Sequence, residues 1–370
     1  MKLISQISQN FKTNMFPSLP KKLFITLSLS ALSLNFSFAQ EGAIKKEIDK
    51  IDTEAKTGEE KLNVGEMIFH HIKDAHEWEF AHGVSLPLPV IIYTKQYGIE
   101  VFSSKNFYEN GNVYNGYILQ HEHIHRLNQA GGIDEEVKVW DFSITKNVAS
   151  MMLSALLLIL VFFAVRKGFD KNKGKAPSGI QSLLEPVIIY IRDEVVKPNI
   201  GPTYERYLPY MLTVFFFILF NNLLGLLPGG ANVTGNIAIT MVLAVFTFLI
   251  TNIGANKHYW LHLVVPTGVP KFMLPLFWIL EPVSVLIKPL SLMIRLFANI
   301  TAGHVIILSL LSLIFIFKSY SVGFGVTLFA TFMNLIELLV AFLQAFIFTL
   351  LSSMYIGSSI EEHHEADHGM

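Results

Sequence analysis

The chain has 370 residues, of which 52% are hydrophobic and 15% charged, and its formal net charge is −1. Soluble domains carry about 25% charged residues, so this composition indicates a membrane protein. No basic patch with interleaved aromatic residues is present, which argues against a nucleic-acid partner. The chain has no cysteine, which rules out disulfides, thiol catalysis and cysteine metal sites.

Residues 1–39 have the pattern of a secretory signal peptide. Lys21 and Lys22 precede the apolar run LFITLSLSALSLNFSFA, and Ser37 and Ala39 fit a small-x-small cleavage site. An uncleaved anchor is the alternative. In both cases, we expect the segment that follows to lie outside the cytoplasm.

Residues 40–145 form a mixed, polar region that we expect to be a small extracytoplasmic domain. The stretch EEKLNVGEMIFHHIKDAHEW is typical of a short amphipathic helix, whereas LPLPVIIYTKQYGIEVFSS is typical of short strands. On a strand, the histidines of HEHIH would share one face and could form a metal site: His121, His123 and His125. An exposed polar loop is the reading that we favour, and we expect no metal and no cofactor.

The membrane domain is predicted to begin at residue 146. The 19 uncharged residues between Lys146 and Arg166 suffice to cross a hydrocarbon core of about 30 Å. The basic stretch RKGFDKNKGK follows, and the positive-inside rule places it in the cytoplasm. The next stretch, IQSLLEPVIIYIRDEVVKPNIG, is amphipathic and too charged to span, so we expect it to lie along the cytoplasmic surface.

Four further spans are predicted up to residue 360. The uncharged run from Tyr207 to Asn256 is broken by LPGGANVTGN into two spans. Two long segments, about 275–317 and 322–358, are separated by KSYSVGFG, and their length requires a strong tilt. The sequence therefore predicts an all-α polytopic membrane protein of about five transmembrane helices, with the long pair packed as an antiparallel hairpin and the tail, residues 361–370, in the cytoplasm.

Polar residues form a stripe along each long segment. Intervals of three or four residues keep a set on one helix face. The first stripe comprises Glu281, Ser284, Lys288, Ser291, Arg295 and Asn299, and the second comprises Thr331, Asn334, Glu337, Ala341 and Gln344.

A tight hairpin centred near Tyr320 would bring the two stripes together. Residues at equal sequence distance from the turn would then face each other, so Arg295 would meet the amide of Gln344. His304 would likewise meet the carboxylate of Glu337. We therefore expect the counter-ion of Arg295 to come from another chain.

Placing these ionisable groups inside the membrane costs more free energy than structural contacts between helices return. A polar contact between membrane helices contributes about 0.6 kcal/mol, whereas an Arg at mid-helix costs about 2.5–3.5 kcal/mol or more. Intramembrane ionisable residues mark ion or proton pathways. His304 can relay protons near neutral pH, but Arg295 cannot, because its guanidinium does not deprotonate in proteins.

From about Gly65 to the last helix, the chain resembles subunit a of the F-type ATP synthase, the stator of a membrane motor. The segments LEPVSVLIKPLSLMIRLFANITAGH and LIELLVAFLQAFIFTLLSSMYI match the two signature helices of that family. Its specific elements are Arg-Leu-Phe-x-Asn-x-x-Ala-Gly and Leu-Gln-Ala-Phe-Ile-Phe. The resemblance implies a multi-pass protein of the bacterial inner membrane that is not catalytic by itself, with an extracytoplasmic N-terminus.

The resemblance also implies roles for residues. Arg295 matches the arginine that displaces the proton from each carboxylate of the c-ring and blocks leakage between two offset half-channels. By position, the outer half-channel or its exit would contain His304, Glu337, Asn334 and Gln344. The cytoplasmic half-channel would contain Glu281, Ser284, Ser291 and Asn299, where Lys288 either assists or only snorkels. The implied partners are the c-ring, the b-type peripheral stalk, the lipid bilayer and the translocated proton.

Two other classes of protein are weighed against this reading. A secondary cation transporter would show inverted repeats and paired broken helices, which the sequence lacks. A membrane anchor with a histidine-rich metal-binding domain would leave the two polar stripes unexplained. The choice between H⁺ and Na⁺, the size of the c-ring and the main direction of ATP turnover are not encoded in this chain.

Overall fold

The computed structural model describes residues 74–81, 84–120, 122–128, 131–172, 174–227, 229–264, 273–317 and 319–360. The predicted signal peptide and the acidic tail lie outside these residues. The described residues fall into two compact units. One is residues 307–336, and the other is the remainder of the described chain.

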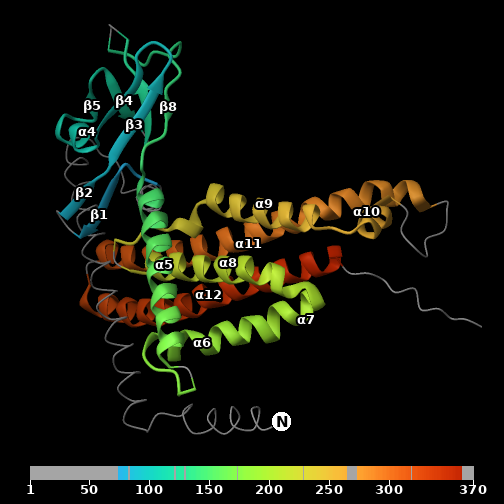
Figure 1. The fold of residues 1–370 in the computed structure, drawn as a ribbon. Helices are drawn as coiled ribbons and strands as arrows, with labels where there is room; N and C mark the ends of the chain where they lie inside the picture. Colours follow the sequence, from blue (N-terminus) through green and yellow to red (C-terminus); the bar gives the residue numbers. More distant parts are fainter. Residues whose placement is uncertain are drawn as a thin grey trace, which may run out of the picture. The chain divides into compact units, whose positions relative to one another are not determined.

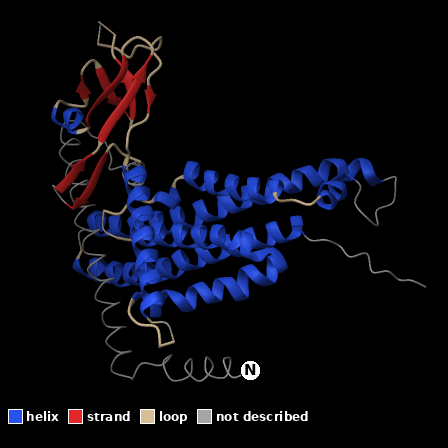
Figure 2. Ribbon diagram, viewed as in Figure 1, coloured by secondary structure: helices blue, strands red, loops and turns tan. Residues whose placement is uncertain are grey.

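A small β-rich domain precedes the membrane helices (Figures 1 and 2). The strands β1 (Glu77–Ala81) and β2 (Val84–Pro87) form a hairpin. A three-stranded sheet has the order β4 (Gly98–Ser103), β3 (Pro89–Thr94), β8 (Trp140–Asp141), and a second has the order β5 (Val113–Tyr114), β6 (Tyr117–Gln120), β7 (His123–Arg126). The short helix α4 (Lys105–Glu109) follows β4. Apolar side chains from both sheets and α4 share one buried core: Val90, Ile92, Phe107, Tyr117, Leu119 and Ile124.

The strands predicted in this domain are present, but the predicted helix is wrong at its end. Glu77 and Trp78 belong to β1, which pairs with β2. The indole of Trp78 is only 7% exposed, so cross-strand pairing and burial override the helical pattern. The earlier part of that predicted helix, up to residue 73, lies outside the described residues.

The rest of the chain is helical. In order, it contains α5 (Lys146–Lys171), α6 (Ile180–Tyr190), the π-helix η1 (Ile191–Val196), α7 (Lys197–Ile200), η2 (Gly201–Thr203), α8 (Tyr204–Gly225), η3 (Val233–Gly235), α9 (Ile237–Ile253), α10 (Lys257–Val264), α11 (Leu274–Phe317) and α12 (Tyr320–Ile360). Four described helical stretches are long and apolar enough to cross a membrane: Lys146–Lys171, Ile180–Gly225, Leu274–Ile314 and Tyr320–Ile360. The 17-residue α9 is shorter. The predicted class, a polytopic helical membrane protein, is confirmed.

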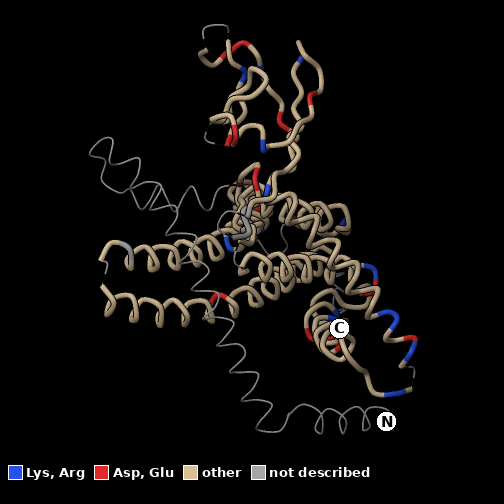
Figure 3. Tube along the Cα trace, turned by 90° about the vertical axis from the view of Figure 1, so that its left-hand side faces the viewer, with Lys and Arg blue, Asp and Glu red and all other residues tan. Residues whose placement is uncertain are grey.

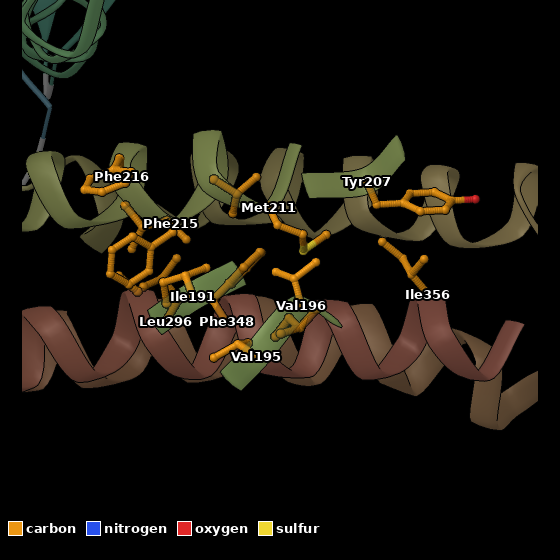
Figure 4. Packing of buried hydrophobic residues seen from close by; sticks show 14 of the residues in the cluster. Ile191, Val195, Val196, Tyr207, Met211, Phe215, Phe216, Leu296, Phe348 and Ile356 are labelled. Atoms are coloured by element: carbon orange, nitrogen blue, oxygen red, sulfur yellow. The ribbon is translucent and has the colours of Figure 1, made fainter. Parts of the chain in front are cut away.

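In the larger unit, α8, α9 and the adjoining parts of α11 and α12 run side by side, and α5 crosses them steeply (Figure 1). Their shared core contains Met211 and Phe215 from α8, Phe348 and Ile356 from α12, and Leu296 from α11 (Figure 4). Figure 3 shows that few charged residues interrupt the long helices. Within this unit, α11 buries Leu292, Leu296 and Ile300 in the core, and its opposite face is exposed.

The stretch predicted to lie on the cytoplasmic surface is bent around this core. It forms α6, η1 and α7, and Ile191, Val195 and Val196 are buried in the core that α8 and α12 also line. On the other side, the guanidinium of Arg192 donates to the carboxylate of Asp193 through Nε at 2.8 Å. The segment is therefore amphipathic, as predicted.

The turn of the hairpin is shorter than predicted. α11 ends at Phe317 and α12 begins at Tyr320, so most of KSYSVGFG is helical. Gly323 N donates to Ser319 O at 2.8 Å, so the helical hydrogen bonds of α12 begin directly after the turn. The two glycines, Gly323 and Gly325, both lie within α12, so neither breaks the helix.

Candidate functional site in the long helical hairpin

The imidazole of His304 and the carboxylate of Glu337 form a direct contact. His304 Nδ1 lies 2.5 Å from Glu337 Oε1, which fulfils the predicted register of the hairpin. The side chain of Glu337 is 5% exposed. A Cβ at Gly303 would lie 3.0 Å from Glu337 Oε1, so the glycine gives the carboxylate its space. The second oxygen, Oε2, is buried and has no hydrogen-bond partner among the described residues.

Asn222, near the end of α8, ties α8 to α12 next to this pair. Its Nδ2 donates to Ala341 O at 3.0 Å, and Ala341 lies one helical turn after Glu337. Its Oδ1 accepts from Thr234 Oγ1 at 2.6 Å. Asn222 and Thr234 are 4% and 1% exposed, so this is a satisfied polar connection inside an apolar core.

A second connection joins the segment before α9 to α11. Thr301 Oγ1 donates to Gly235 O at 3.4 Å, and Thr301 lies one turn before His304. Within the same segment, Gly235 N donates to Asn232 Oδ1 at 2.9 Å. Residues 229–236, which we call the α8–α9 loop, are therefore bonded directly to Thr301, one turn before His304. They reach Ala341, one turn after Glu337, only through Asn222.

Arg295 lies on the uncovered face of α11. Leu292, Leu296 and Ile300 turn toward the core, so the side chain of Arg295 projects away from it and is exposed. Its exposed neighbour Ile294 is apolar. In the described part of the chain, Arg295 forms no ion pair, and it forms no hydrogen bond with Gln344. Gln344 is 4% exposed.

The two polar stripes lie in different surroundings. On α11, Ser284 and Asn299 are exposed like Arg295, while Glu281, Lys288 and Ser291 are half-buried. On α12, Asn334 is 8% exposed and is buried like Glu337 and Gln344. The structure therefore brings together His304 and Glu337, and it turns the Arg295 side of the first stripe outward.

Lys288 borders a small cavity that the sequence did not predict. Its Nζ lies 5.6 Å from the centre of the Tyr355 ring. The cavity is also lined by polar side chains of α9 and α10: Thr247, Thr251, Asn252 and Tyr259. A signal for Tyr355 was present, because residues 344, 348, 352 and 355 continue the helical spacing of the α12 stripe.

The HEHIH stretch is only partly a strand. His123 and His125 flank the buried Ile124 on β7, and His121 lies outside the described residues. Within the described chain, no group of three or more His, Asp or Glu residues is arranged to hold a metal ion.

The fold and these buried ionisable groups define a polytopic membrane protein with a charged site between its longest helices. Residues 148–357 match the family model of the ATP synthase A chain, so the chain belongs to that family. Residues 67–142 match a family described only as a domain of unknown function.

Curated relatives agree with this assignment. The ATP synthase subunit a of Chlorobium phaeobacteroides strain BS1 is 40% identical over 323 residues, which cover 85% of this chain and 81% of the relative. The subunit a of Chloroherpeton thalassium is 45% identical, covering 63% of this chain and 72% of the relative. That of Anaeromyxobacter sp. strain Fw109-5 is 38% identical, covering 83% and 73%. The family resemblance seen in the sequence is confirmed.

Proposed function

We propose that this chain is the proton-channel stator of an F-type ATP synthase, a subunit that is not catalytic by itself. The observation that carries the proposal is the position of Arg295. Its guanidinium lies on an uncovered apolar face, without an ion pair among the described residues. A permanent charge in hydrocarbon is expensive, so this face calls for an anionic partner.

The anion is supplied by the rotor. Each c subunit of the ring presents one buried carboxylate, and Arg295 attracts it and favours its ionised form, because a nearby cation lowers a carboxyl pKa. The proton is thereby released from the arriving subunit. Arg295 also repels protons and other cations that would pass directly between the two half-channels.

Two groups of residues form the paths to and from the rotor. His304, Glu337, Asn334 and Gln344 belong to the outer half-channel, where the imidazole of His304 and the buried carboxylate of Glu337 can accept and pass on a proton. Glu281, Ser284, Ser291 and Asn299 belong to the cytoplasmic half-channel, and Lys288 borders the cavity on that side. Each proton that crosses the potential delivers about 2.3 kcal/mol per 100 mV.

This function implies the membrane in which the chain lies and its orientation in that membrane. It is a multi-pass protein of a bacterial inner membrane, with residues 40–145 outside and residues 361–370 in the cytoplasm. Its partners are the c-ring and the b-type stalk subunits, which hold the stator still while the ring turns. Residues 1–39 act as the export signal.

The test is ATP-driven proton pumping by vesicles that contain the complex with Arg295→Ala. The matched control is Arg166→Ala, which removes an exposed arginine at the end of α5. Passive proton flux is recorded after the catalytic head has been stripped off. We expect lost pumping for Arg295→Ala, with the c-ring still bound, and normal pumping for Arg166→Ala. Pumping near the wild-type rate in Arg295→Ala would overturn the proposal.

A further inference from the structure

Residues 74–78, which we call the bracing segment, bond to three separate parts of the chain. Alternate residues make the contacts, because successive side chains of an extended segment point to opposite sides. Asp74, His76 and Trp78 each bind a different element. The segment lies in the region that matches a domain of unknown function.

Asp74 fastens the segment to the start of α5. Its Oδ2 accepts from Thr145 Oγ1 at 2.7 Å, and its Oδ1 accepts from the backbone N–H of Asn147 at 3.0 Å. The backbone N–H of Lys146 donates to Ala75 O at 2.8 Å. Asp74, although remote in the sequence, thus caps the N-terminus of α5. Its negative charge lies at the positive end of the helix dipole.

His76 fastens the segment to the β-rich domain. It is 2% exposed, with Nε2 2.9 Å from Asp141 Oδ2 and Nδ1 3.5 Å from Glu122 Oε2. Burial lowers the pKa of His76, but the hydrogen bonds and charges of Asp141 and Glu122 outweigh it and raise the pKa to about 9. The buried imidazolium of His76 is therefore held by the carboxylates of Asp141 on β8 and Glu122 in the β6–β7 turn. We call this ion-paired contact the joint at His76.

Trp78 reaches the membrane helices. Its Nε1 donates to Gly229 O, at the start of the α8–α9 loop, at 2.8 Å, and its ring is 7% exposed. Gly230, the next residue, is packed so closely that a Cβ would lie 2.1 Å from Leu224 O. Trp78 therefore holds the first residue of the loop through a hydrogen bond. At its other end, Thr234 donates to Asn222, and Gly235 accepts from Thr301, one turn before His304.

We propose that the extracytoplasmic domain acts as a brace: through Trp78 it holds the α8–α9 loop in the position in which the loop borders the His304–Glu337 pair. Trp78 is thus a positioning residue for proton transfer. The proposal rests on the proposed function for the role of the pair, but not for the contact itself. It assigns a task to a domain whose function its family description leaves open.

The experiment compares Trp78→Phe with wild type in the intact complex. Phenylalanine keeps an aromatic ring and removes the N–H donor. The matched control, Trp140→Phe, changes a 46% exposed tryptophan of the same domain whose ring contacts Lys138. Amide hydrogen exchange is measured in the α8–α9 loop and in β3 and β4. The pH dependence of passive proton flux through the membrane sector is measured in parallel.

We expect the loop amides, those of Val233 and Gly235 among them, to exchange about 2- to 12-fold faster in Trp78→Phe, as the loss of one hydrogen bond implies. The amides of β3 and β4 are expected to keep their rates, since the domain stays folded. The pH profile of proton flux is expected to shift, because the loop beside the pair has moved. A mere loss of assembled complex would lower the flux without shifting the profile.

Equal loop exchange in Trp78→Phe and Trp140→Phe would overturn the brace. So would faster loop exchange with an unshifted pH profile, because the loop would then not influence the pair. Glu337→Gln separates this proposal from the proposed function. Normal proton flux in that variant would refute the role of the pair, whereas loop exchange in Trp78→Phe reports on the contact alone.

Discussion

His304 and Glu337 stand 33 positions apart in the sequence, and their side chains meet inside the hairpin with Nδ1 and Oε1 2.5 Å apart. Arg295, on the same helix as His304, does not share this contact and faces outward. The hairpin therefore keeps an exchangeable proton site inside the chain and a permanent cation on its surface. These two surroundings suit two different tasks, proton transfer and attraction of an anion.

Exchanging His304 and Glu337 tests whether proton transfer needs one acid and one imidazole, or needs each residue on its own helix. We expect Glu337→Gln to lower ATP-driven proton pumping by about 10²-fold, the scale of a lost acid–base group. The double variant His304→Glu/Glu337→His keeps one acid and one imidazole, so its pumping should return close to wild type. The control is His304→Glu alone, which places two carboxylates together. A double variant as inactive as this control would contradict the relay.

The joint at His76 predicts how the stability of the β-rich domain depends on pH. The pKa of His76 is raised from 6.5 to about 9, so its stabilisation is complete below about pH 6.5 and is lost as the pH rises through about 9. Burial raises the pKa of Asp141, but its hydrogen bonds with His76 and Ser143 outweigh this and lower it. The same joint therefore weakens again as the pH falls below the ordinary carboxyl range. The raised pKa corresponds to about 3 kcal/mol.

The measurement is the unfolding temperature of the domain between pH 5 and 10, followed by tryptophan fluorescence. Wild type should lose stability between pH 6.5 and 9, whereas His76→Gln should be less stable at pH 6 and nearly flat over that range. His123→Gln, an exposed histidine on β7, is the control and should follow wild type. A wild-type curve without this alkaline decline would refute the ion-paired state of His76.

Two glycines of α12 predict opposite effects of the same substitution. A Cβ at Gly357 would lie 1.9 Å from Asn199 O, so Gly357→Ala must push α12 away from α7 and should destabilise the chain by about 1–3 kcal/mol. Gly325 has no atom within 4 Å of such a Cβ. Gly325→Ala should therefore stabilise its helix by about 0.5–1 kcal/mol. Thermal unfolding in detergent distinguishes the two, and equal shifts would contradict the close α7–α12 packing.

The hydrogen bonds of Asn222 predict that two substitutions reduce stability and proton pumping to different extents. Asn222→Leu deletes both of its hydrogen bonds and leaves the buried hydroxyl of Thr234 without its acceptor, at a cost of about 1–3 kcal/mol. Thr234→Val is the milder change, because Asn222 keeps its bond to Ala341 O. We expect thermal stability and proton pumping to fall in the order wild type, Thr234→Val, Asn222→Leu. If the valine variant were the more damaged, the bond to α12 would not be the important one.

The hairpin was the most predictable part of the fold. His304 and Glu337 lie at nearly equal sequence distance from a turn centred near Tyr320, so a tight antiparallel hairpin places them opposite each other. The strands β3 and β4 also followed from their β-branched and aromatic residues. The second long helix begins at Tyr320, slightly before the predicted start at about residue 322, because the apolar residues around Gly323 and Gly325 continue the helix.

Other features have no local signature. The bond from Trp78 to the carbonyl of Gly229 joins residues 151 positions apart and depends on how the domain and the helices pack. The outward direction of Arg295 depends on which neighbours α11 buries, namely Leu292 and Leu296. The polar stripe gives the face of α11 on which Arg295 lies, but not whether that face is covered by the rest of the chain.

The uncovered guanidinium also bears on how the complex is made. A newly inserted chain has no anion for Arg295 within its described residues, and it would hold that charge toward lipid at a cost of about 2.5–3.5 kcal/mol or more. In the proposed function, a carboxylate of the docked rotor would remove this cost. The same residue that is proposed to work during turnover would therefore make the unassembled subunit less stable in the membrane than the assembled one.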